Sequence, residues 1–389
     1  MKSMYFTYDG LLDPLGQSQI MPYLERLAAA GHEFTIVSYE KDRPPVEVAA
    51  FAEKLRRLGI AWHRLTFRSQ WFGFPRRLMA GVFLLRKLCI KTRPDLVHLR
   101  GLMPAVIYQL ARLRIPYLYD FRGFALEEWT EIGKLRAGSL GHRMLRRIDR
   151  RAVRRAAGLV VLEKPAEVLL RQTYPVPEVP LKVIRTCTDT GRFGLRAGGQ
   201  QRDGRALRFV VLGGARFPYL PKHALRLVAQ FRAAGVDARI DFFNERDHAQ
   251  IAAAVEETGF PRAAVEVRHV AHAAVPAQLS AYDCGLVFCE SSPWRRVCSP
   301  TKVGEYLAAG LPVISLVGID ALDALAVRTD CVRTVKDPLA ADDVPALTAF
   351  IRAPSVAAAC QALAREEFDL ASAGRLYMDL YAEIEARAG

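Results

Sequence analysis

Short apolar runs alternate with amphipathic segments along the whole chain. Between the runs, periodic apolar positions predict helices such as Ile20–Ala30 and Pro75–Lys91, which end at Gly31 and before Pro94. This alternation is typical of βαβ units around a parallel sheet. The apolar runs of the first half predict strands at Met4–Thr7, Phe34–Ser38, Leu96–Leu99, Tyr117–Tyr119 and Gly158–Leu162.

The alternation restarts in the second half, after a stretch that is rich in Gly, Arg and Gln and poor in aliphatic residues. We therefore expect two Rossmann-like, doubly wound α/β domains at 1–194 and 207–370, a linker at 195–206 and a final helix at 371–389. Ligands of open α/β sheets bind at the carboxyl ends of the strands, so we expect these ends to face a cleft. The second set of predicted strands is Arg208–Leu212, Arg239–Phe243, Val265–Val270, Gly285–Phe288 and Val313–Leu316.

The composition of the chain indicates a strongly basic protein. The chain has 389 residues, enough for two domains, and Lys plus Arg outnumber Asp plus Glu by 55 to 41, a formal charge of +14. Such a surface attracts nucleotide phosphates, nucleic acid or an anionic membrane. No apolar run approaches the roughly 20 residues of a spanning helix, and the N-terminus lacks the apolar core of a signal peptide. The seven cysteines lack metal-ligand spacing. We expect a cytoplasmic protein with reduced thiols and no metal site.

The most informative segment begins at Ser299-Pro300-Thr301 and continues through Lys302 to Glu305. It predicts a Pro turn, a short helix and then a buried strand. A Ser-Pro pair before a helix leaves backbone N–H groups where an anion can sit. Glu305, one turn further, can accept hydrogen bonds from a vicinal diol such as a ribose. Phosphate donors beside a diol acceptor suit a nucleotide, and an ordinary helix-to-strand junction is the alternative.

This segment resembles the donor-nucleotide motif of the retaining, family 4 type glycosyltransferases with the GT-B fold. The resemblance covers nearly the whole chain and implies a GT-B architecture whose last helix crosses back to the N-terminal domain. It also implies that the N-terminal domain binds the acceptor and the C-terminal domain binds the nucleotide sugar. Further matching segments are Gly31-His32-Glu33, Pro94–His98, Val183–Phe193 and the helical pattern at Phe368–Ile384.

A glycine turn opens the second domain at Gly213-Gly214, and Arg216 and Lys222 flank it. A strand, a glycine turn and a helix bring backbone N–H groups close to an anion. Glycosyl transfer from a nucleotide sugar leaves a diphosphate, and fixed cations stabilise its growing charge. The resemblance places an Arg and a Lys in that role, which we assign to Arg216 and Lys222, so that no metal is required. Two solvated basic residues are the alternative.

Two loops of the first domain complete the predicted site. The resemblance places the loop containing Gly16 near the donor phosphate and the acceptor, with Gln17 and Gln19 close by. Arg122 stands where many relatives carry a His, and because an Arg stays protonated it cannot act as a base. We expect it to bind an acceptor or phosphate oxygen, or to pair with Asp120. In retaining transfer the leaving phosphate itself can take the acceptor proton, so no dedicated base is required.

One further departure concerns Val297, which occupies a position where many members carry a Glu. In this chain, the backbone near Cys298 or the side chain of Glu290 would contact the sugar in place of that carboxylate, or the contact is lost. The predicted catalytic residues are Arg216, Lys222 and Arg122. The predicted donor-binding residues are Gly16, Gly213, Gly214, Ser299, Pro300, Thr301, Lys302 and Glu305.

The resemblance implies a retaining glycosyltransferase that moves a sugar from a UDP- or GDP-sugar to a saccharide or lipid-linked acceptor. Its context would be the biosynthesis of cell-surface polysaccharide or glycoconjugates. Two alternatives remain: a catalytically silent GT-B relative that serves as a nucleotide- or sugar-binding partner subunit, and a GT-B nucleotide-sugar epimerase. The silent relative is kept as an alternative because Val297 and Arg122 depart from the common family pattern.

The excess positive charge gathers in two stretches. Arginines recur at helical spacing from Arg143 to Arg155 with an apolar side, and Trp71–Arg77 mixes aromatic residues with arginines. A basic amphipathic helix beside aromatic residues can lie on an anionic membrane, which would suit a lipid-linked acceptor. A solvated helix face is the alternative. Nucleic acid is not an expected partner, because no recognised nucleic-acid motif is present.

Overall fold

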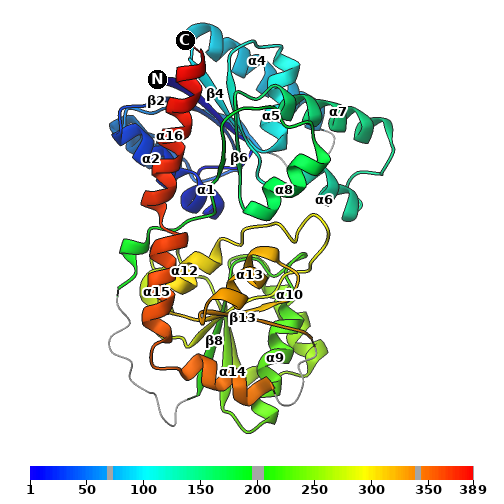
Figure 1. The fold of residues 1–389 in the computed structure, drawn as a ribbon, viewed down its shortest axis with the longest axis vertical. Helices are drawn as coiled ribbons and strands as arrows, with labels where there is room; N and C mark the ends of the chain where they lie inside the picture. The colour runs from blue at the N-terminus through cyan, green and yellow to red at the C-terminus, as the bar shows by residue number, and fades with distance from the viewer. Residues whose placement is uncertain (68–72, 195–205, 338–342, 389) are drawn as a thin grey trace. The chain divides into compact units, whose positions relative to one another are not determined.

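The computed structural model describes residues 1–67, 73–194, 206–337 and 343–388. The chain divides into two compact units: Met1–Arg185 together with Leu370–Gly389, and Thr186–Asp369. Each unit is built on one parallel sheet with helices on both faces (Figure 1). The predicted class, two doubly wound α/β domains, is confirmed. The predicted linker at 195–206 lies, except for Ala206, outside the described residues.

The sheet of the N-terminal unit has seven strands in the order β3-β2-β1-β4-β5-β6-β7, and all neighbours are parallel. The order reverses between β1 and β4, where Thr7 lies opposite Arg100. Arg100 in turn lies opposite Asp120. Polar residues therefore line the carboxyl edge at the switch point. The strands are β1 (Lys2–Thr7), β2 (Glu33–Glu40), β3 (Ala61–Thr66), β4 (Leu96–Arg100), β5 (Tyr117–Asp120), β6 (Gly158–Val161) and β7 (Leu181–Val183).

Helices cover both faces of this sheet. Three of them, α4, α5 and α7, pack side by side on one face, and α2 and α16 pack together on the other (Figure 1). The helices are α1 (Pro14–Gln19), α2 (Met21–Ala29), α3 (Pro45–Arg57), α4 (Phe74–Thr92), α5 (Leu102–Ala111), α6 (Ala125–Glu131), α7 (Leu140–Arg154), α8 (Lys164–Thr173) and α16 (Leu370–Ala388).

The last helix, α16, belongs to the N-terminal unit, as the GT-B prediction required. Its predicted apolar face, Tyr377, Leu380 and Tyr381, is buried there, as is Ile384. The ring of Tyr377 packs edge-on against Tyr23 of α2, with the centroids 5.3 Å apart. The apolar stripe of α16 thus closes one face of the sheet.

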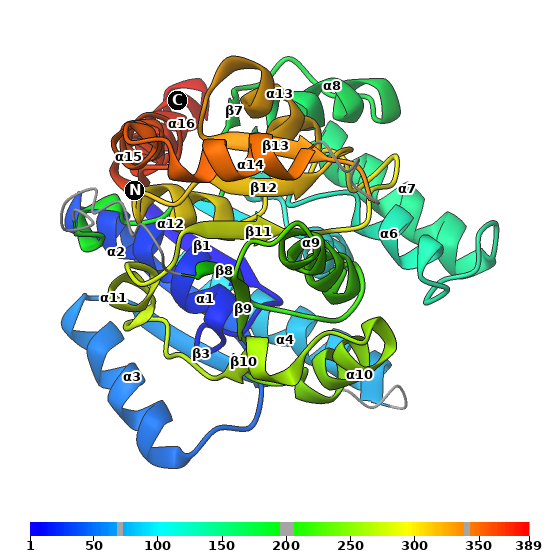
Figure 2. The same ribbon diagram turned by 90° about the horizontal axis from the view of Figure 1, so that it is seen from below.

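The second unit has a six-stranded parallel sheet, and Figure 2 shows its strands side by side in the order β10-β9-β8-β11-β12-β13. Its switch point lies between β8 and β11. The strands are β8 (Leu207–Leu212), β9 (Ala238–Phe243), β10 (Val265–Arg268), β11 (Cys284–Val287), β12 (Val313–Leu316) and β13 (Val332–Val335). The helices are α9 (Pro221–Ala233), α10 (His248–Thr258), α11 (Val275–Leu279), α12 (Lys302–Ala308), α13 (Asp320–Arg328), α14 (Asp343–Arg352) and α15 (Val356–Glu367).

Two apolar clusters hold this second unit together, one on each face of its sheet. The first joins α11, α12, α13 and α15 to the sheet, and Tyr306 and Leu307 of α12 are fully buried in it. The second joins α9, α10 and α14 to the opposite face around Phe209, Phe231 and Phe242. Apolar side chains on both faces explain why the central strands read as continuous apolar runs in the sequence.

Three strands were absent from the sequence prediction: β3, β7 and β13. All three lie at an edge of their sheet. β3 and β7 contain no fully buried residue, and β13 is buried only at its two ends. An edge strand has a neighbour on one side only, so its sequence is not a continuous apolar run.

No single helix of the described chain is long and apolar enough to span a membrane. One bent pair, Asp343–Arg352 with Val356–Glu367, passes that test on length and composition, with an angle of 76° between its helices.

Candidate active site

The segment Ser299–Glu305 lies beside the switch point of the second sheet, and Tyr306 holds it there. The Leu212 N–H at the end of β8 donates to the Tyr306 hydroxyl (2.7 Å), which donates in turn to the Val210 carbonyl (3.2 Å). A Cβ atom at Gly285 of β11 would lie 2.3 Å from the Tyr306 ring. The glycine therefore lets the ring cross β11, and α12 is fixed over the ends of the two strands.

Lys302 is the cation that this arrangement presents. Its side chain is 6% exposed, and its ammonium lies 4.0 Å from the centre of the Tyr219 ring. No carboxylate of the described residues lies within 4 Å of it. Burial lowers the pKa of Lys302 from 10.5 to about 8, which leaves the amine mostly protonated at neutral pH. A buried cation held against a ring, with no acid to neutralise it, is suited to receive an anion.

Glu305, one turn along α12, is also buried but has a partner. Its Oε1 lies 3.3 Å from Nε2 of His272, in the segment between β10 and α11. The sequence prediction missed His272, because a single His in a polar loop gives no pattern. The carboxylate and the imidazole together offer hydrogen-bonding groups next to Lys302.

The glycine turn after β8 lies against the same cluster. Gly213 has φ of +88°, which favours glycine, and a Cβ atom at Gly214 would lie 3.2 Å from the Tyr219 ring. The chain beyond the turn is fastened to the segment after β11: Leu220 N–H donates to Phe288 O (3.0 Å), and Glu290 N–H to Pro218 O (2.8 Å). Gly214, Tyr219 and Lys302 thus form one continuous set of contacts.

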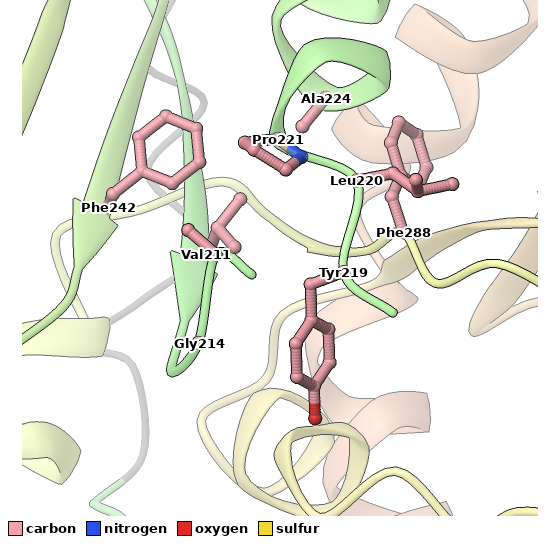
Figure 3. A pocket seen from close by; sticks show the side chains of 9 residues that line it. Val211, Gly214, Tyr219, Leu220, Pro221, Ala224, Phe242 and Phe288 are labelled. Carbon is pink, nitrogen blue, oxygen red and sulfur yellow. The ribbon is translucent and has the colours of Figure 1, made fainter. Parts of the chain in front are cut away.

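Figure 3 shows an apolar pocket behind this turn, lined by Val211, Leu220, Pro221, Phe242 and Phe288 among others. Its volume is about 10 Å³, no more than one water molecule requires. A nucleotide therefore has no room in it, and the pocket belongs to the packing beneath the site.

Arg216 and Lys222, the predicted catalytic cations, both have acidic partners in this structure. Arg216 Nε lies 2.6 Å from Asp247 Oδ1, and Lys222 forms an ion pair with Glu257 of α10. Both basic side chains are largely exposed. The pair of Lys222 with Glu257 is exposed on both sides and contributes at most about 1 kcal/mol, so a phosphate can displace it. Asp247 is buried, so a phosphate must compete with a buried carboxylate for Arg216.

Asp247 and Asn244, which follow β9, also fix the backbone of the glycine turn. Asp247 Oδ2 accepts from the Ala215 N–H (3.0 Å), and Asn244 Nδ2 donates to the Gly213 carbonyl (2.8 Å). Although burial opposes the change, hydrogen bonds from Ala215 and Arg216 lower the pKa of Asp247. The sequence prediction missed both residues, although polar residues directly after a strand are a usable signal.

The remaining donor-binding candidates serve to anchor the segment. Ser299 is buried, and its carbonyl accepts from the Thr186 hydroxyl (2.9 Å). The Pro300 carbonyl accepts from the Val303 N–H (3.1 Å), and Thr301 directly precedes α12. Val297 is buried, whereas Glu290 is exposed.

Gly16 lies in the N-terminal unit, at a close approach between α1 and the loop before it. A Cβ atom there would lie 2.1 Å from the Gly10 carbonyl oxygen. Gln17 Nε2 donates to the Leu11 carbonyl (2.6 Å), and Gln19 is buried. The glycine is thus required by the packing of its own loop.

Arg122 lies at the carboxyl edge of the N-terminal sheet, 3.5 Å from Asp120, its predicted alternative partner. Asp120 is buried at the centre of a network: Tyr377 donates to it (3.1 Å), and Arg100 and His98 lie 3.6 and 3.5 Å away. Burial alone would raise the pKa of Asp120, but Arg122, His98 and Arg100 hold it well below its usual range.

Among the described residues, no group of three or more His, Cys, Asp or Glu side chains is arranged to hold a metal ion. No disulfide joins the seven cysteines, all of which lie in the described ranges, and all but Cys298 are buried.

Comparison with known proteins identifies the class. Residues 17–187 match the family of glycosyl transferase 4-like domains. Curated protein sequences yield no significant match. The structure is similar to sucrose-phosphate synthase from Thermosynechococcus elongatus, with a TM-score of 0.72 and 16% identity over 99% of both chains. It is also similar to HepE from Anabaena in complex with UDP and glucose, with a TM-score of 0.68 and 14% identity over 98% of this chain and 99% of that chain. A third similar structure is WaaG, a glycosyltransferase of lipopolysaccharide biosynthesis, with a TM-score of 0.65 and 15% identity over 97% of this chain and 99% of that chain.

The chain is therefore a glycosyltransferase of the GT-B type, with a glycosyl transferase 4-like domain in its N-terminal half. The resemblance, the fold and the enzyme class predicted from the sequence are confirmed.

Proposed function

We propose that this glycosyltransferase moves a sugar, with retention, from a UDP- or GDP-sugar to a saccharide or lipid-linked acceptor. The observation that carries the proposal is the position of Lys302 over Tyr219, next to Glu305, at the switch point of the second sheet. A buried cation without an acidic partner suits a diphosphate, and a carboxylate one turn further suits a ribose diol.

Three cations of the second unit would stabilise the transition state of the reaction. The bond between C1 of the sugar and the β-phosphate oxygen breaks, and the acceptor oxygen bonds to C1 on the same face. The acceptor proton passes to an oxygen of the leaving phosphate. Lys302 stabilises the charge that grows on the diphosphate, as do Arg216 and Lys222 once they leave Asp247 and Glu257. With these cations in place, no metal is required.

The acceptor would bind to the N-terminal unit, near Arg122 and the loop of Gly16. Arg122 is partly exposed beside a buried carboxylate that keeps it in place, so it can contact an acceptor or phosphate oxygen. We infer a role in cell-surface polysaccharide or glycoconjugate synthesis in the cytoplasm.

Helix α7 supports contact of the N-terminal unit with an anionic membrane. Arg147, Arg150 and Arg154 are exposed there, together with Leu140 and Met144, which are 83% and 57% exposed. Of the stretch Trp71–Arg77, also predicted for this surface, Trp71 and Phe72 lie outside the described residues, and Phe74–Arg77 form the start of α4.

A thermal-shift screen against UDP, GDP, ADP and CMP, each with and without magnesium, tests the donor assignment. We expect selective stabilisation by one nucleoside diphosphate that magnesium does not change. The same nucleotide's sugar conjugates are then tested for transfer and for slow hydrolysis. Binding without either reaction would support a silent partner subunit, and conversion of the donor without any acceptor would support an epimerase. A stabilisation that requires magnesium would contradict the role given to the three cations.

A further inference from the structure

A second charged feature lies at the amino-terminal edge of the N-terminal sheet, away from Asp120 and Arg122. A groove of about 980 Å³ lies between the end of α5, the segment leading into β5 and the last turns of α7. Tyr117, the first residue of β5, forms part of its lining. Asp120 ends the same strand, so the groove and the polar network occupy opposite edges of one sheet.

Four arginines line this groove: Arg112, Arg114, Arg151 and Arg155. No acidic side chain is among its lining residues, and none of the four has an ion pair within 4 Å in the described part of the chain. Arg146 on the same helix differs, since it lies 2.9 Å from Glu127. Within the described residues, no ion pair therefore offsets the positive charge of the groove.

The floor of the groove is rigid. The Tyr117 hydroxyl donates to the Ala152 carbonyl of α7 (2.7 Å) and accepts from Gln109 Nε2 (3.2 Å). The Tyr108 ring packs against Tyr117, with the centroids 4.7 Å apart, and its hydroxyl donates to the Ile115 carbonyl. These bonds fix α7 and the segment before β5 to one another, so the arginines are carried by a preformed frame.

The backbone at the rim of the groove is left-handed where α5 ends. Arg112 ends α5 with φ of +51°, in the left-handed region that glycine and asparagine adopt more easily. An arginine in this conformation loses backbone stability and gains a guanidinium at the mouth of the groove. Arg93 follows α4 in the same conformation, so Arg112 is distinguished by its place in the lining of the groove and not by its backbone.

We propose that this groove binds a phosphate or diphosphate group, separately from the donor site. Guanidinium groups bind phosphate oxygens in pairs of hydrogen bonds, and four unpaired ones around a preformed groove match a dianion or trianion. Leu110, which is 42% exposed, and Leu113 add an apolar wall on which a nonpolar substituent of the phosphate can lie. The ligand is thus either a soluble phosphorylated compound or the headgroup of an anionic lipid.

The test is a calorimetric titration of the full chain with inorganic diphosphate, combined with hydrogen exchange to locate the bound anion. The groove variant is Arg151→Gln with Arg155→Gln. Its matched control is Arg86→Gln with Lys87→Gln, which removes the same charge from the exposed surface of α4 in the same unit, outside the groove. We expect diphosphate to protect residues 108–117 and 148–155 from exchange. Groove affinity should fall about tenfold or more in the groove variant and change little in the control.

A second arm distinguishes the sources of the phosphate. Vesicles of phosphatidylcholine with and without phosphatidylglycerol are tested with the same three proteins. If diphosphate does not bind but phosphatidylglycerol vesicles do, with loss in the groove variant only, the ligand is a lipid headgroup and the proposal stands. An equal loss in both variants, an unaffected groove variant, or no binding of either probe would overturn it. Protection confined to residues of the second unit would overturn it too, and would leave the donor proposal intact.

Discussion

The carboxyl edges of the two sheets carry polar clusters that differ in one respect. In the N-terminal unit, Asp120 is surrounded by Arg100, His98, Arg122 and Tyr377, so that its charge is met from several sides. In the second unit, the ammonium of buried Lys302 lies against the Tyr219 ring, and no carboxylate of the described residues lies within 4 Å of it. Both clusters remove a charge from water, but among the described residues only the first balances it with ion pairs within 4 Å, since the nearby Glu305 lies against His272.

This difference separates a structural role from a binding role. A buried charge that is fully paired holds elements together, and here it ties β4, β5 and α16 into one unit. A buried charge that lacks an opposite partner raises the energy of the free protein and lowers it again when a ligand supplies that partner. The second cluster is therefore the better candidate for a site that must bind and release a charged group.

The largest effect is expected from breaking the first cluster. Asp120→Ala removes the buried carboxylate beside Arg100 and leaves it with Asp9, a partly exposed carboxylate 3.5 Å away, so it should lower the free energy of unfolding by about 3–5 kcal/mol. Urea denaturation measures this loss. Asp42→Ala, an exposed carboxylate of the same unit, should leave the denaturation midpoint unchanged. If both variants unfold at the wild-type urea concentration, the network does not hold the unit together.

A smaller loss is expected where the second cluster is positioned. Gly285→Ala places a methyl group 2.3 Å from the Tyr306 ring, so that ring and α12 must move. Overpacking of this kind costs about 1–3 kcal/mol of stability, and nucleotide affinity should fall with it because Lys302 and Glu305 are displaced. Gly141→Ala, which meets only Leu135 at 3.8 Å, is the control and should keep both properties. Normal nucleotide binding in a destabilised Gly285→Ala protein would show that Tyr306 does not position the site.

The pH dependence of binding should distinguish the two clusters. Because burial lowers the pKa of Lys302 to about 8, affinity for a nucleoside diphosphate should fall as pH rises through that value and the amine loses its proton. Titrations between pH 7 and 9.5 measure this, and Lys302→Met should bind the nucleotide weakly at every pH.

The stability of the ligand-free protein should change with pH in the opposite direction. The folded state holds this proton less tightly than the unfolded chain, so wild-type stability relative to Lys302→Met should rise from about pH 8 to 10.5. A pH-independent affinity would contradict the role given to Lys302.

The smallest effect is expected at Glu257. Its ion pair with Lys222 is exposed, so Glu257→Ala should change stability by less than about 1 kcal/mol. Removing the competitor for Lys222 should instead tighten nucleotide binding modestly, as a titration at low ionic strength would detect. Weaker binding in this variant would mean that Glu257 holds Lys222 in its binding position.

The central strands and the last helix could be predicted because burial on both faces, or along one stripe, leaves a regular apolar pattern. The edge strands β3, β7 and β13 could not, since one exposed side interrupts that pattern. Lys302 and Glu305 stand out within a single motif. Tyr219, His272 and Asp247 do not, because loops far apart in the sequence bring them to the site.

The most direct test of the donor site compares nucleoside diphosphate affinity in wild type, Glu305→Gln and Glu256→Gln. Glu256 is an exposed carboxylate on α10 of the same unit and serves as the matched control. We expect a loss of about tenfold or more in Glu305→Gln, because a hydrogen bond to a charged acceptor is lost, with an unchanged melting temperature and an unaffected control. Equal affinity of all three proteins would contradict the donor site.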